Sequence, residues 1–266
     1  MSGDQPSAGG EDGGDPPAIR ADDLTKRYGR FLAVDGVSFS VADGETVGLF
    51  GPNGAGKSTT LRMLAGLVRP TAGTVHFGGV ERSLGDPDAT SGVGVVTHDA
   101  MLYDDLTARE NLRFHARLHG VDGVDARVEA VLDDVGLADR GSRRPATFSH
   151  GLRKRLSLAR ALLHDPEVLL LDEPYSGLDQ RGVADLGRIL DGVDDRTVLL
   201  STHDLDLGLE RCSRALVLDR GRVQADLQTE STSSSEFEAA YRRAIGLDAE
   251  RDDQSTGDHS TALDQR

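Results

Sequence analysis

The 266-residue sequence contains one cysteine, few lysines, no tryptophan and no long apolar run. The single cysteine, Cys212, excludes an internal disulfide and any metal site built from several cysteines, and it fits a reducing compartment. No segment approaches the roughly 18 consecutive apolar residues of a membrane span. Met1 is followed by acidic, Gly- and Pro-rich sequence instead of the basic and then apolar stretch of a signal peptide. We therefore expect the chain to stay in the cytoplasm.

Positive charge is scarce as well. The sequence has 30 basic and 45 acidic residues, a formal net charge of −15, and this balance excludes a surface that coats nucleic acid. Lysine occurs only at Lys26, Lys57 and Lys154, and most of the acidic residues are aspartate. A dense acidic surface repels itself in dilute buffer, and strong screening removes that cost. The composition therefore predicts a halophilic protein that works in a high-salt cytosol.

Two acidic ends flank a central α/β block. Residues 1–18 hold four acids, no bases and many Gly, Pro and Ser residues, and we expect them to form a disordered arm. Residues 247–266 hold six acids and two bases and are expected to form a second disordered tail. Between them, residues 19–246 alternate short β-rich runs with amphipathic stretches, which is typical of an α/β domain with a largely parallel sheet.

The spacing of apolar residues places the expected elements of this block. Short apolar runs bounded by turn residues predict strands, and segments with helical spacing predict helices. Strands are expected at residues 46–50, 92–97, 168–171 and 197–201, and helices at residues 58–67, 107–118, 124–135 and 149–163. The last three helices fall in a mostly helical subdomain, about residues 83–160, inserted into the α/β core.

A Gly-rich loop carries the strongest chemical signal. Residues 51–58 fit the pattern G-x-x-x-x-G-K-[ST], directly after an expected strand and before an expected helix. Glycine lets the backbone turn its N–H groups toward phosphate oxygens, and the positive end of the following helix adds attraction. Lys57 would reach the β- and γ-phosphates, and Ser58 would offer its hydroxyl to Mg²⁺. The expected nucleotide-binding residues here are Gly51, Pro52, Asn53, Gly54, Ala55, Gly56, Lys57, Ser58 and Thr59.

Two further strand ends carry carboxylates and a histidine. Asp172 and Glu173 follow the expected strand at 168–171, and His203 follows the one at 197–201. Asp172 would hold Mg²⁺, and Glu173 would polarise the attacking water. Ligands collect at the carboxyl edge of open α/β sheets, where both strands would end. His203 is therefore expected to hold the water and Glu173 in line with the γ-phosphate.

Together these residues resemble the ATP-binding subunit of an ABC transporter, over about residues 19–244. The resemblance implies a P-loop NTPase of the ABC ATPase type, with a RecA-like core, a β-rich N-terminal part and an inserted helical subdomain. It implies that the chain binds ATP and Mg²⁺ and hydrolyses ATP. Tyr28 lies where the family stacks an aromatic ring on adenine. Asp179 resembles the D-loop aspartate, and His203 the switch histidine.

Ser149, His150 and Gly151 resemble the start of the family signature. In the family this signature caps the ATP bound by the opposite subunit, so that two subunits enclose two nucleotides. Ser149 is also a suitable N-cap for the helix that follows, and the free N–H groups of a helix start attract phosphate. A simple helix cap is the alternative, and both roles can hold at once.

Two positions depart from the family pattern. His150 and Leu152 stand where the signature has glycine and glutamine, and His98 stands where most members have the Q-loop glutamine that senses Mg²⁺. Imidazole is titratable, so pH-sensitive coupling is one expected consequence. His98 and residues 106–119 are similar to ATPases of the cytochrome c maturation haem exporter. Residues 148–151 are closer to ATPases of ABC-2 type multidrug or lipid exporters, so haem export is the first expectation and ABC-2 export the alternative.

We expect an ATPase dimer, homo- or heteromeric, that powers export through separate membrane subunits at the cytoplasmic face of the membrane. Residues 106–118 and 124–135 are the expected contact surface, unless these helices only face the core. A soluble ABC ATPase of translation or DNA repair is disfavoured, because Lys57 and Ser149 are only 92 positions apart and one cassette is present. An ATP-binding scaffold without hydrolysis is disfavoured because the hydrolytic residues are intact.

Overall fold

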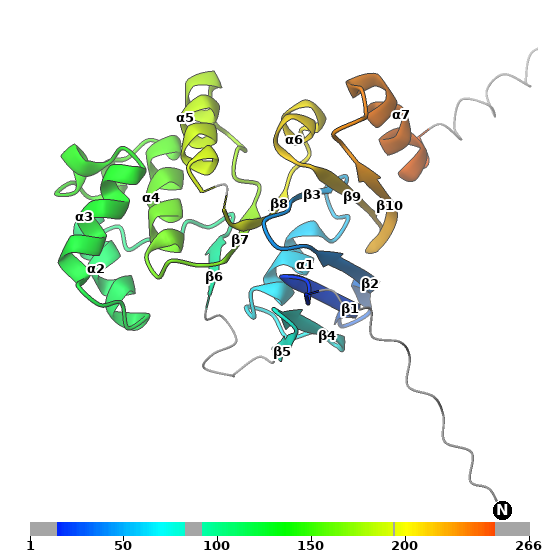
Figure 1. Cartoon of the computed structure of the whole chain (residues 1–266), viewed down its shortest axis with the longest axis horizontal. Helices are drawn as coiled ribbons and strands as arrows, with labels where there is room; N and C mark the ends of the chain where they lie inside the picture. Colours follow the sequence, from blue (N-terminus) through cyan, green and yellow to red (C-terminus); the bar gives the residue numbers. More distant parts are fainter. Residues whose placement is uncertain (1–14, 83–91, 194, 248–266) are drawn as a thin grey trace, which may run out of the picture.

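Parallel strands form the centre of the molecule (Figure 1). The computed structural model describes residues 15–82, 92–193 and 195–247. The larger sheet has the strand order β10-β9-β3-β8-β7-β6, in which β10 is antiparallel to β9 and the other neighbours are parallel. Every residue of β7 and β8 is buried, as in parallel strands covered on both faces. The strands are β3 (Thr46–Phe50), β6 (Val93–Val96), β7 (Val168–Asp172), β8 (Thr197–Ser201), β9 (Arg214–Asp219) and β10 (Arg222–Gln228).

A smaller antiparallel sheet forms the β-rich N-terminal part that was expected. Its strand order is β2-β1-β4-β5. An apolar cluster joins it to helix α1 (Lys57–Leu64) and to the larger sheet, through residues such as Val37, Leu61 and Leu49. Since α1 packs into the core that both sheets share, the loop before it is held at a fixed place. The four strands are β1 (Ile19–Tyr28), β2 (Phe31–Val41), β4 (Ala72–Phe77) and β5 (Val80–Arg82).

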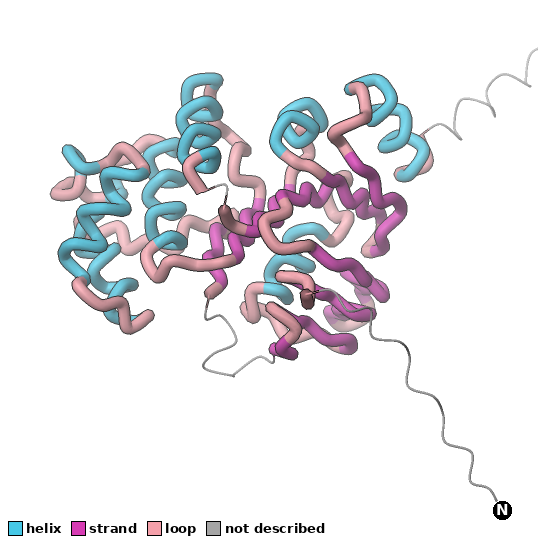
Figure 2. Tube along the Cα trace, viewed as in Figure 1, coloured by secondary structure: helices cyan, strands magenta, loops and turns pink. Residues whose placement is uncertain are grey.

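Helices α2 (Ala108–Leu118), α3 (Val124–Asp134) and α4 (His150–Leu162) lie together at one side of the sheets (Figure 2). They share an apolar core whose members include Leu112, Val131 and Leu156. Helix α4 begins at the expected N-cap, since the Ser149 hydroxyl accepts from the Leu152 N–H. At the start of α2, Thr107 forms a capping box with Glu110. Two short 3-10 turns, η1 (Ala138–Arg140) and η2 (Pro145–Thr147), connect α3 to α4.

The helical subdomain begins later along the chain than the expected range of 83–160. Strand β6 falls inside that range, yet it pairs with β7 and so belongs to the larger sheet. The helical part therefore starts after β6, and α4 extends it to Leu162. Helix α1 also ends earlier than expected, at Leu64 instead of residue 67, because Gly66 has a φ of 65° in the left-handed region that ends helices.

The remaining helices of the described residues are α5 (Gln180–Asp191), α6 (Leu205–Arg211) and α7 (Ser234–Ala244). Helix α7 covers the β9–β10 end of the larger sheet, and the Phe237 ring meets the Phe50 ring edge-on with centroids 5.1 Å apart. None of the described helices is long and apolar enough to cross a membrane. The expected arm at 1–18 and tail at 247–266 lie outside the described residues, apart from residues 15–18 and 247.

Candidate active site

Three strand ends meet at one edge of the larger sheet. Strand β8 lies between β3 and β7, and all three are parallel, so their carboxyl ends lie at the same edge. Ser201, the last residue of β8, is the register partner of Leu49 on one side and of Asp172 on the other. The loop at 51–56, the Asp172–Glu173 pair and His203 are therefore neighbours, as the strand-end argument from the sequence predicts.

The loop at 51–56 wraps tightly against two other parts of the chain. Gly51 has a φ of 147°, and a Cβ atom there would lie 2.1 Å from the Leu218 carbonyl oxygen at the end of β9. Gly56 has a φ of 105°, and its Cβ would lie 2.7 Å from the Ala33 carbonyl oxygen in β2. Side chains are thus excluded by backbone on both sides. No side chain caps the start of α1, so its first N–H groups face the loop and are free for a phosphate.

Lys57 lies across this loop. Its ammonium donates to the carbonyl oxygens of Gly51 at 2.6 Å and Pro52 at 3.2 Å, and it lies 3.9 Å from the Glu173 carboxylate. Burial lowers the pKa of Lys57, while the carboxylates of Glu173 and Asp172 act in the opposite direction. The side chain is 6% exposed, so its charge is little screened by water.

Asp172 is the centre of a hydroxyl–carboxylate group. The hydroxyls of Ser58 and Ser201 both donate to Asp172 Oδ1, each at 2.8 Å. The other oxygen, Oδ2, is buried and has no hydrogen-bond partner among the described residues. A buried carboxylate oxygen without a partner is costly unless a cation or donor meets it. Carboxylate and hydroxyl oxygens are ligands that Mg²⁺ accepts, so this pair of residues fits the metal expected here.

Glu173 has both its backbone and its side chain fixed. Its φ is 50°, in the left-handed region, and its N–H donates to the Ser201 hydroxyl at 2.9 Å. Its Oε2 lies 2.9 Å from His203 Nδ1 and its Oε1 lies 3.9 Å from Lys57 Nζ. The carboxylate is mostly buried, whereas the His203 ring is 60% exposed. The Glu173 carboxylate thus lies between the His203 imidazole and the Lys57 ammonium, beside the loop at 51–56.

The residues of the expected signature form a second group. Ser149 caps α4, Asp179 caps α5 by accepting from the Gly182 N–H at 2.7 Å, and His150 Nε2 lies 3.1 Å from the Ser176 carbonyl oxygen. These side chains line an open cavity of about 570 Å³ together with Gly151 and the cations Arg140, Lys154, Arg155 and Arg181. The start of α4 therefore lies at this cavity.

Two expected site residues lie on the surface. Tyr28 ends β1, is 48% exposed, and has Lys26 Nζ 5.1 Å from its ring centroid. His98 is exposed in the turn that follows β6. Their expected roles, adenine stacking and the Q-loop contact, stay predictions.

Two residues that the sequence did not single out contribute to the site. Ser201 links Asp172 to the Glu173 backbone, and Lys154 on α4 donates to the Glu173 carbonyl oxygen. A serine at the end of a buried strand is on its own a weak indication of a site residue. The rarity of lysine is a stronger indication, because Lys57 and Lys154 are two of only three lysines and both lie beside Glu173.

A family model described as "ABC transporter" matches residues 34–176, more than half of the chain. The chain is 39% identical over 235 residues to the "Nod factor export ATP-binding protein I" of Paraburkholderia xenovorans, which covers 87% of this chain and 77% of that protein. It is 36% identical to the "Linearmycin resistance ATP-binding protein LnrL" of Bacillus subtilis, over 78% of this chain and 68% of that protein. It is also 39% identical to the "Xylose/arabinose import ATP-binding protein XacJ" of Haloferax volcanii, over 77% of this chain and 55% of that protein.

Among solved structures, "Dimeric Structure of MJ0796, a Bacterial ABC Transporter Cassette" superposes with a TM-score of 0.74 at 26% identity, covering 80% of this chain and all of that one. The fold and the loop after β3 define the class of P-loop nucleotide hydrolases. Within that class, the chain belongs to the ABC transporter family, as its ATP-binding cassette. It binds ATP with Mg²⁺ and hydrolyses ATP, and the fold expected from the sequence is confirmed.

Proposed function

We propose that this chain is the ATPase subunit of an ABC-2 type exporter, bound to the cytoplasmic face of the membrane through separate membrane subunits. The observation that carries its hydrolytic role is the Glu173 carboxylate held between Lys57 and His203. Glu173 accepts a proton from the attacking water, His203 holds the carboxylate in line, and Lys57 offsets charge on the phosphates. Ser58 and Asp172 would hold Mg²⁺, which neutralises phosphate charge when bound.

A dimer is the proposed working form. Ser149, His150, Gly151 and Asp179 line one open cavity, and no residue of the loop at 51–56 lines it. The charged side chains around them include Arg140, Arg155, Arg181 and Asp185. Three arginines against two aspartates, at the start of a helix, suit a phosphate that a second copy or a related subunit brings. The similarity of this chain to a cassette described as dimeric supports a dimer. Tyr28 is proposed to stack on adenine from the exposed end of β1.

The surface proposed to contact the membrane subunits lies on α2 and the loop before it. Met101, Tyr103, Phe114 and Leu118 are exposed apolar residues there, and the rings of Tyr103 and Phe114 meet edge-on at 5.1 Å. We call these four residues the α2 patch. Three large apolar residues of α3, in contrast, are buried: Val128, Val131 and Leu132 are each 0% exposed. Of the two helices expected to form the contact, α2 is therefore the better supported.

Export is favoured over import by the extent of the matches. The Nod factor export protein matches over more of both chains than the xylose/arabinose import protein does, and the linearmycin resistance protein also matches more of its own length. None of these three names concerns haem. The expectation of haem export rests only on the resemblance at His98 and residues 106–119, so ABC-2 export takes first place. The halophilic character also rests on composition alone.

The role of Glu173 is tested by Glu173→Gln in the purified full chain. Glutamine keeps the shape of the side chain and one accepting oxygen but accepts no proton. We expect turnover to fall by about 10²-fold or more while the affinity for Mg-ATP changes less than about threefold. Equal turnover in the two proteins would contradict the assignment of Glu173 as the base.

The membrane partner is tested by purifying the tagged chain from detergent-solubilised membranes of its source. We expect a membrane-spanning protein to copurify, and we expect Phe114→Ser in the α2 patch to weaken the association. Val80→Ser is the matched control, because Val80 is an exposed apolar residue on the smaller sheet. If haem absorbance copurifies with the complex, haem export is favoured. If no membrane-spanning protein copurifies with the chain, the proposed role in transport is contradicted.

A further inference from the structure

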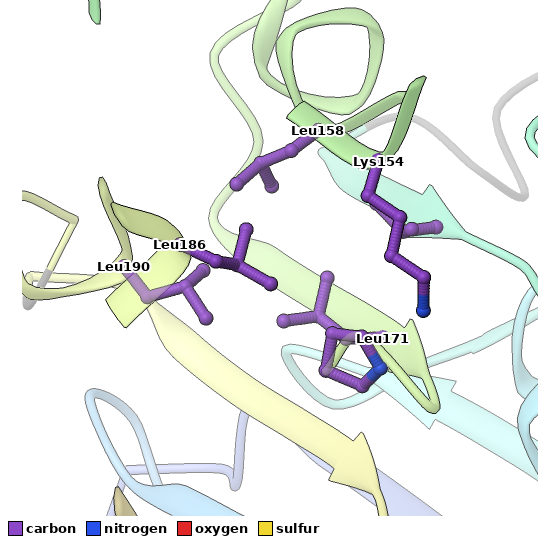
Figure 3. Close-up of a pocket in the computed structure, with 7 residues that line it drawn as sticks. Lys154, Leu158, Leu171, Leu186 and Leu190 are labelled. Carbon is purple, nitrogen blue, oxygen red and sulfur yellow. The ribbon is translucent and has the colours of Figure 1, made fainter. Parts of the chain in front are cut away.

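Lys154 is a half-buried lysine without an assigned role. Its stem leaves α4 beside a small apolar pocket that also touches β7 and α5, and Figure 3 shows the side chain extending past Leu171 toward the end of β7. The ammonium donates to the Glu173 carbonyl oxygen. Burial lowers the pKa of Lys154 to about 8, and the Glu173 and Asp172 carboxylates oppose that shift. Burying an ammonium group beside leucines costs free energy unless a polar contact offsets that cost.

The polar contact of Lys154 is with the backbone of Glu173, whose conformation is strained. Its φ of 50° is unfavourable for a residue with a Cβ, so neighbouring contacts must hold it. The Ser201 hydroxyl accepts from its N–H at 2.9 Å, and its carbonyl oxygen accepts from Lys154 and from the Ser176 N–H at 3.2 Å. The N–H and the carbonyl of Glu173 are therefore both held by hydrogen bonds. The carboxylate projects from this fixed backbone toward Lys57 and His203.

Helix α4 contacts this segment at a second point. His150 lies one turn before Lys154 on the same helix, and its Nε2 lies 3.1 Å from the Ser176 carbonyl oxygen. Side chains four residues apart share one face of a helix. One face of α4 thus holds the turn from Glu173 to Ser176, which carries the catalytic carboxylate.

We infer that Lys154 is a positioning residue for hydrolysis: its ammonium holds the Glu173 carbonyl so that the carboxylate stays aimed at the phosphate loop. The inference rests on the proposed role of Glu173 as the base. Lys154 acts through Glu173 and touches no reacting atom. If Lys154 merely filled space beside the pocket, its loss would lower stability without changing the balance between binding and chemistry.

The first test is Lys154→Met in the full chain, because methionine keeps most of the stem and removes the donor. We expect kcat to fall by about tenfold while the Kd for Mg-ATP and KM stay within about twofold. Lys154→Arg restores a donor and should recover part of kcat. Arg196→Met is the matched control, since Arg196 donates to the Pro166 carbonyl at the other end of β7. Unchanged kcat in Lys154→Met, or equal losses of kcat and affinity, would overturn the inference.

The second test combines Lys154→Met with Glu173→Gln and measures the single-turnover rate of ATP hydrolysis. If Lys154 acts only through Glu173, the double variant should be no slower than Glu173→Gln alone. A further loss of the same size as in the wild-type background would overturn the inference. If the thermal midpoint of Lys154→Met shows that this variant does not fold, Lys154→Gln and Lys154→Arg take its place in the same double-mutant cycle with Glu173→Gln. Full turnover in Glu173→Gln would instead contradict the proposed function, so the two failures are distinguishable.

Discussion

Ser58 and Asp172 are 114 positions apart in the sequence, and the Ser58 hydroxyl donates to Asp172 Oδ1 at 2.8 Å. This hydrogen bond joins the first turn of α1 to the end of β7. It also orients the carboxylate so that Oδ2, which has no hydrogen-bond partner among the described residues, is the oxygen left for a cation. The same two side chains therefore join α1 to β7 and are the ones proposed to hold Mg²⁺.

Replacement of Asp172 tests that affinity. Asp172→Asn keeps an oxygen for the two hydroxyls and removes the charge, so we expect Mg²⁺ to bind at least about tenfold more weakly and kcat to fall by about 10²-fold. The measurement is ATP turnover across a Mg²⁺ titration. Asp165→Asn, an exposed position before the other end of β7, is the control and should leave the Mg²⁺ dependence unchanged. An unaltered Mg²⁺ dependence in Asp172→Asn would remove Asp172 from the metal site.

Gly51 and Gly54 in the phosphate loop should respond differently to alanine. A Cβ at Gly51 meets the Leu218 carbonyl oxygen at 2.1 Å, whereas a Cβ at Gly54 meets no atom within 4 Å. We expect Gly51→Ala to lower the free energy of unfolding by about 3 kcal/mol or more, because backbone must move. Gly54→Ala should cost only about 1 kcal/mol, from its positive φ. Urea unfolding measures both, and similar losses would contradict the tight packing of Gly51 against β9.

Ser201→Ala should affect both stability and turnover. The change leaves the Glu173 N–H without its acceptor in a buried place, which costs about 1–3 kcal/mol of unfolding free energy. It also frees the backbone that aims the Glu173 carboxylate, so we expect kcat to fall by about fivefold or more. Ser213→Ala removes a comparable hydroxyl, one that donates to the Thr46 carbonyl at the opposite ends of the strands. That control should lower the thermal midpoint and leave the turnover of the folded protein intact.

His115 should make the fold less stable in acid. Burial, with smaller effects of Arg160 and His119, lowers the pKa of His115 from 6.5 to about 4. Between these two pH values the unfolded chain binds a proton that the folded chain does not, so the free energy of unfolding falls as the pH falls from about 6.5 to about 4. His119 and His164 have lowered pKa values and act in the same direction.

The effect of His115 can be isolated by comparing urea midpoints at pH 7 and pH 5. We expect His115→Asn to lose less stability between these values than the wild type, by on the order of 1 kcal/mol since the side chain is only partly buried. His98→Gln, at an exposed position, serves as the control and should lose as much as the wild type. Identical acid losses in all three proteins would assign the pH dependence to other groups.

The site could be predicted from the sequence where the residues are contiguous or follow a strand. The residues of the phosphate loop lie within nine positions, and Asp172, Glu173 and His203 follow buried strands whose ends must share one edge. Ser201 and Lys154 could not be assigned this way. Their partners are fixed by the order β3-β8-β7 and by the place of α4 beside β6, where Lys154 reaches the residue after β7. Short apolar runs do not reveal which strands are neighbours.

The boundary of the helical part shows a related limit. The strand expected at 92–97 lies within the expected helical range, yet residues 93–96 form β6 at the edge of the larger sheet. Sequence spacing separates strands from helices, but only pairing shows to which unit a strand belongs. The smaller sheet was expected only as a β-rich part, since its strands β1, β2, β4 and β5 show mixed burial patterns.

Asp172 and Ser201 are hydrogen-bonded side chains and also register partners in the β7–β8 ladder. A slip of one residue between these strands would turn every side chain of one strand to the opposite face. It would separate the carboxylate from the hydroxyl and displace the Glu173 backbone. ATP turnover therefore reports the fidelity of folding: the specific activity of a preparation counts the molecules in which the parallel sheet has been assembled in the correct register.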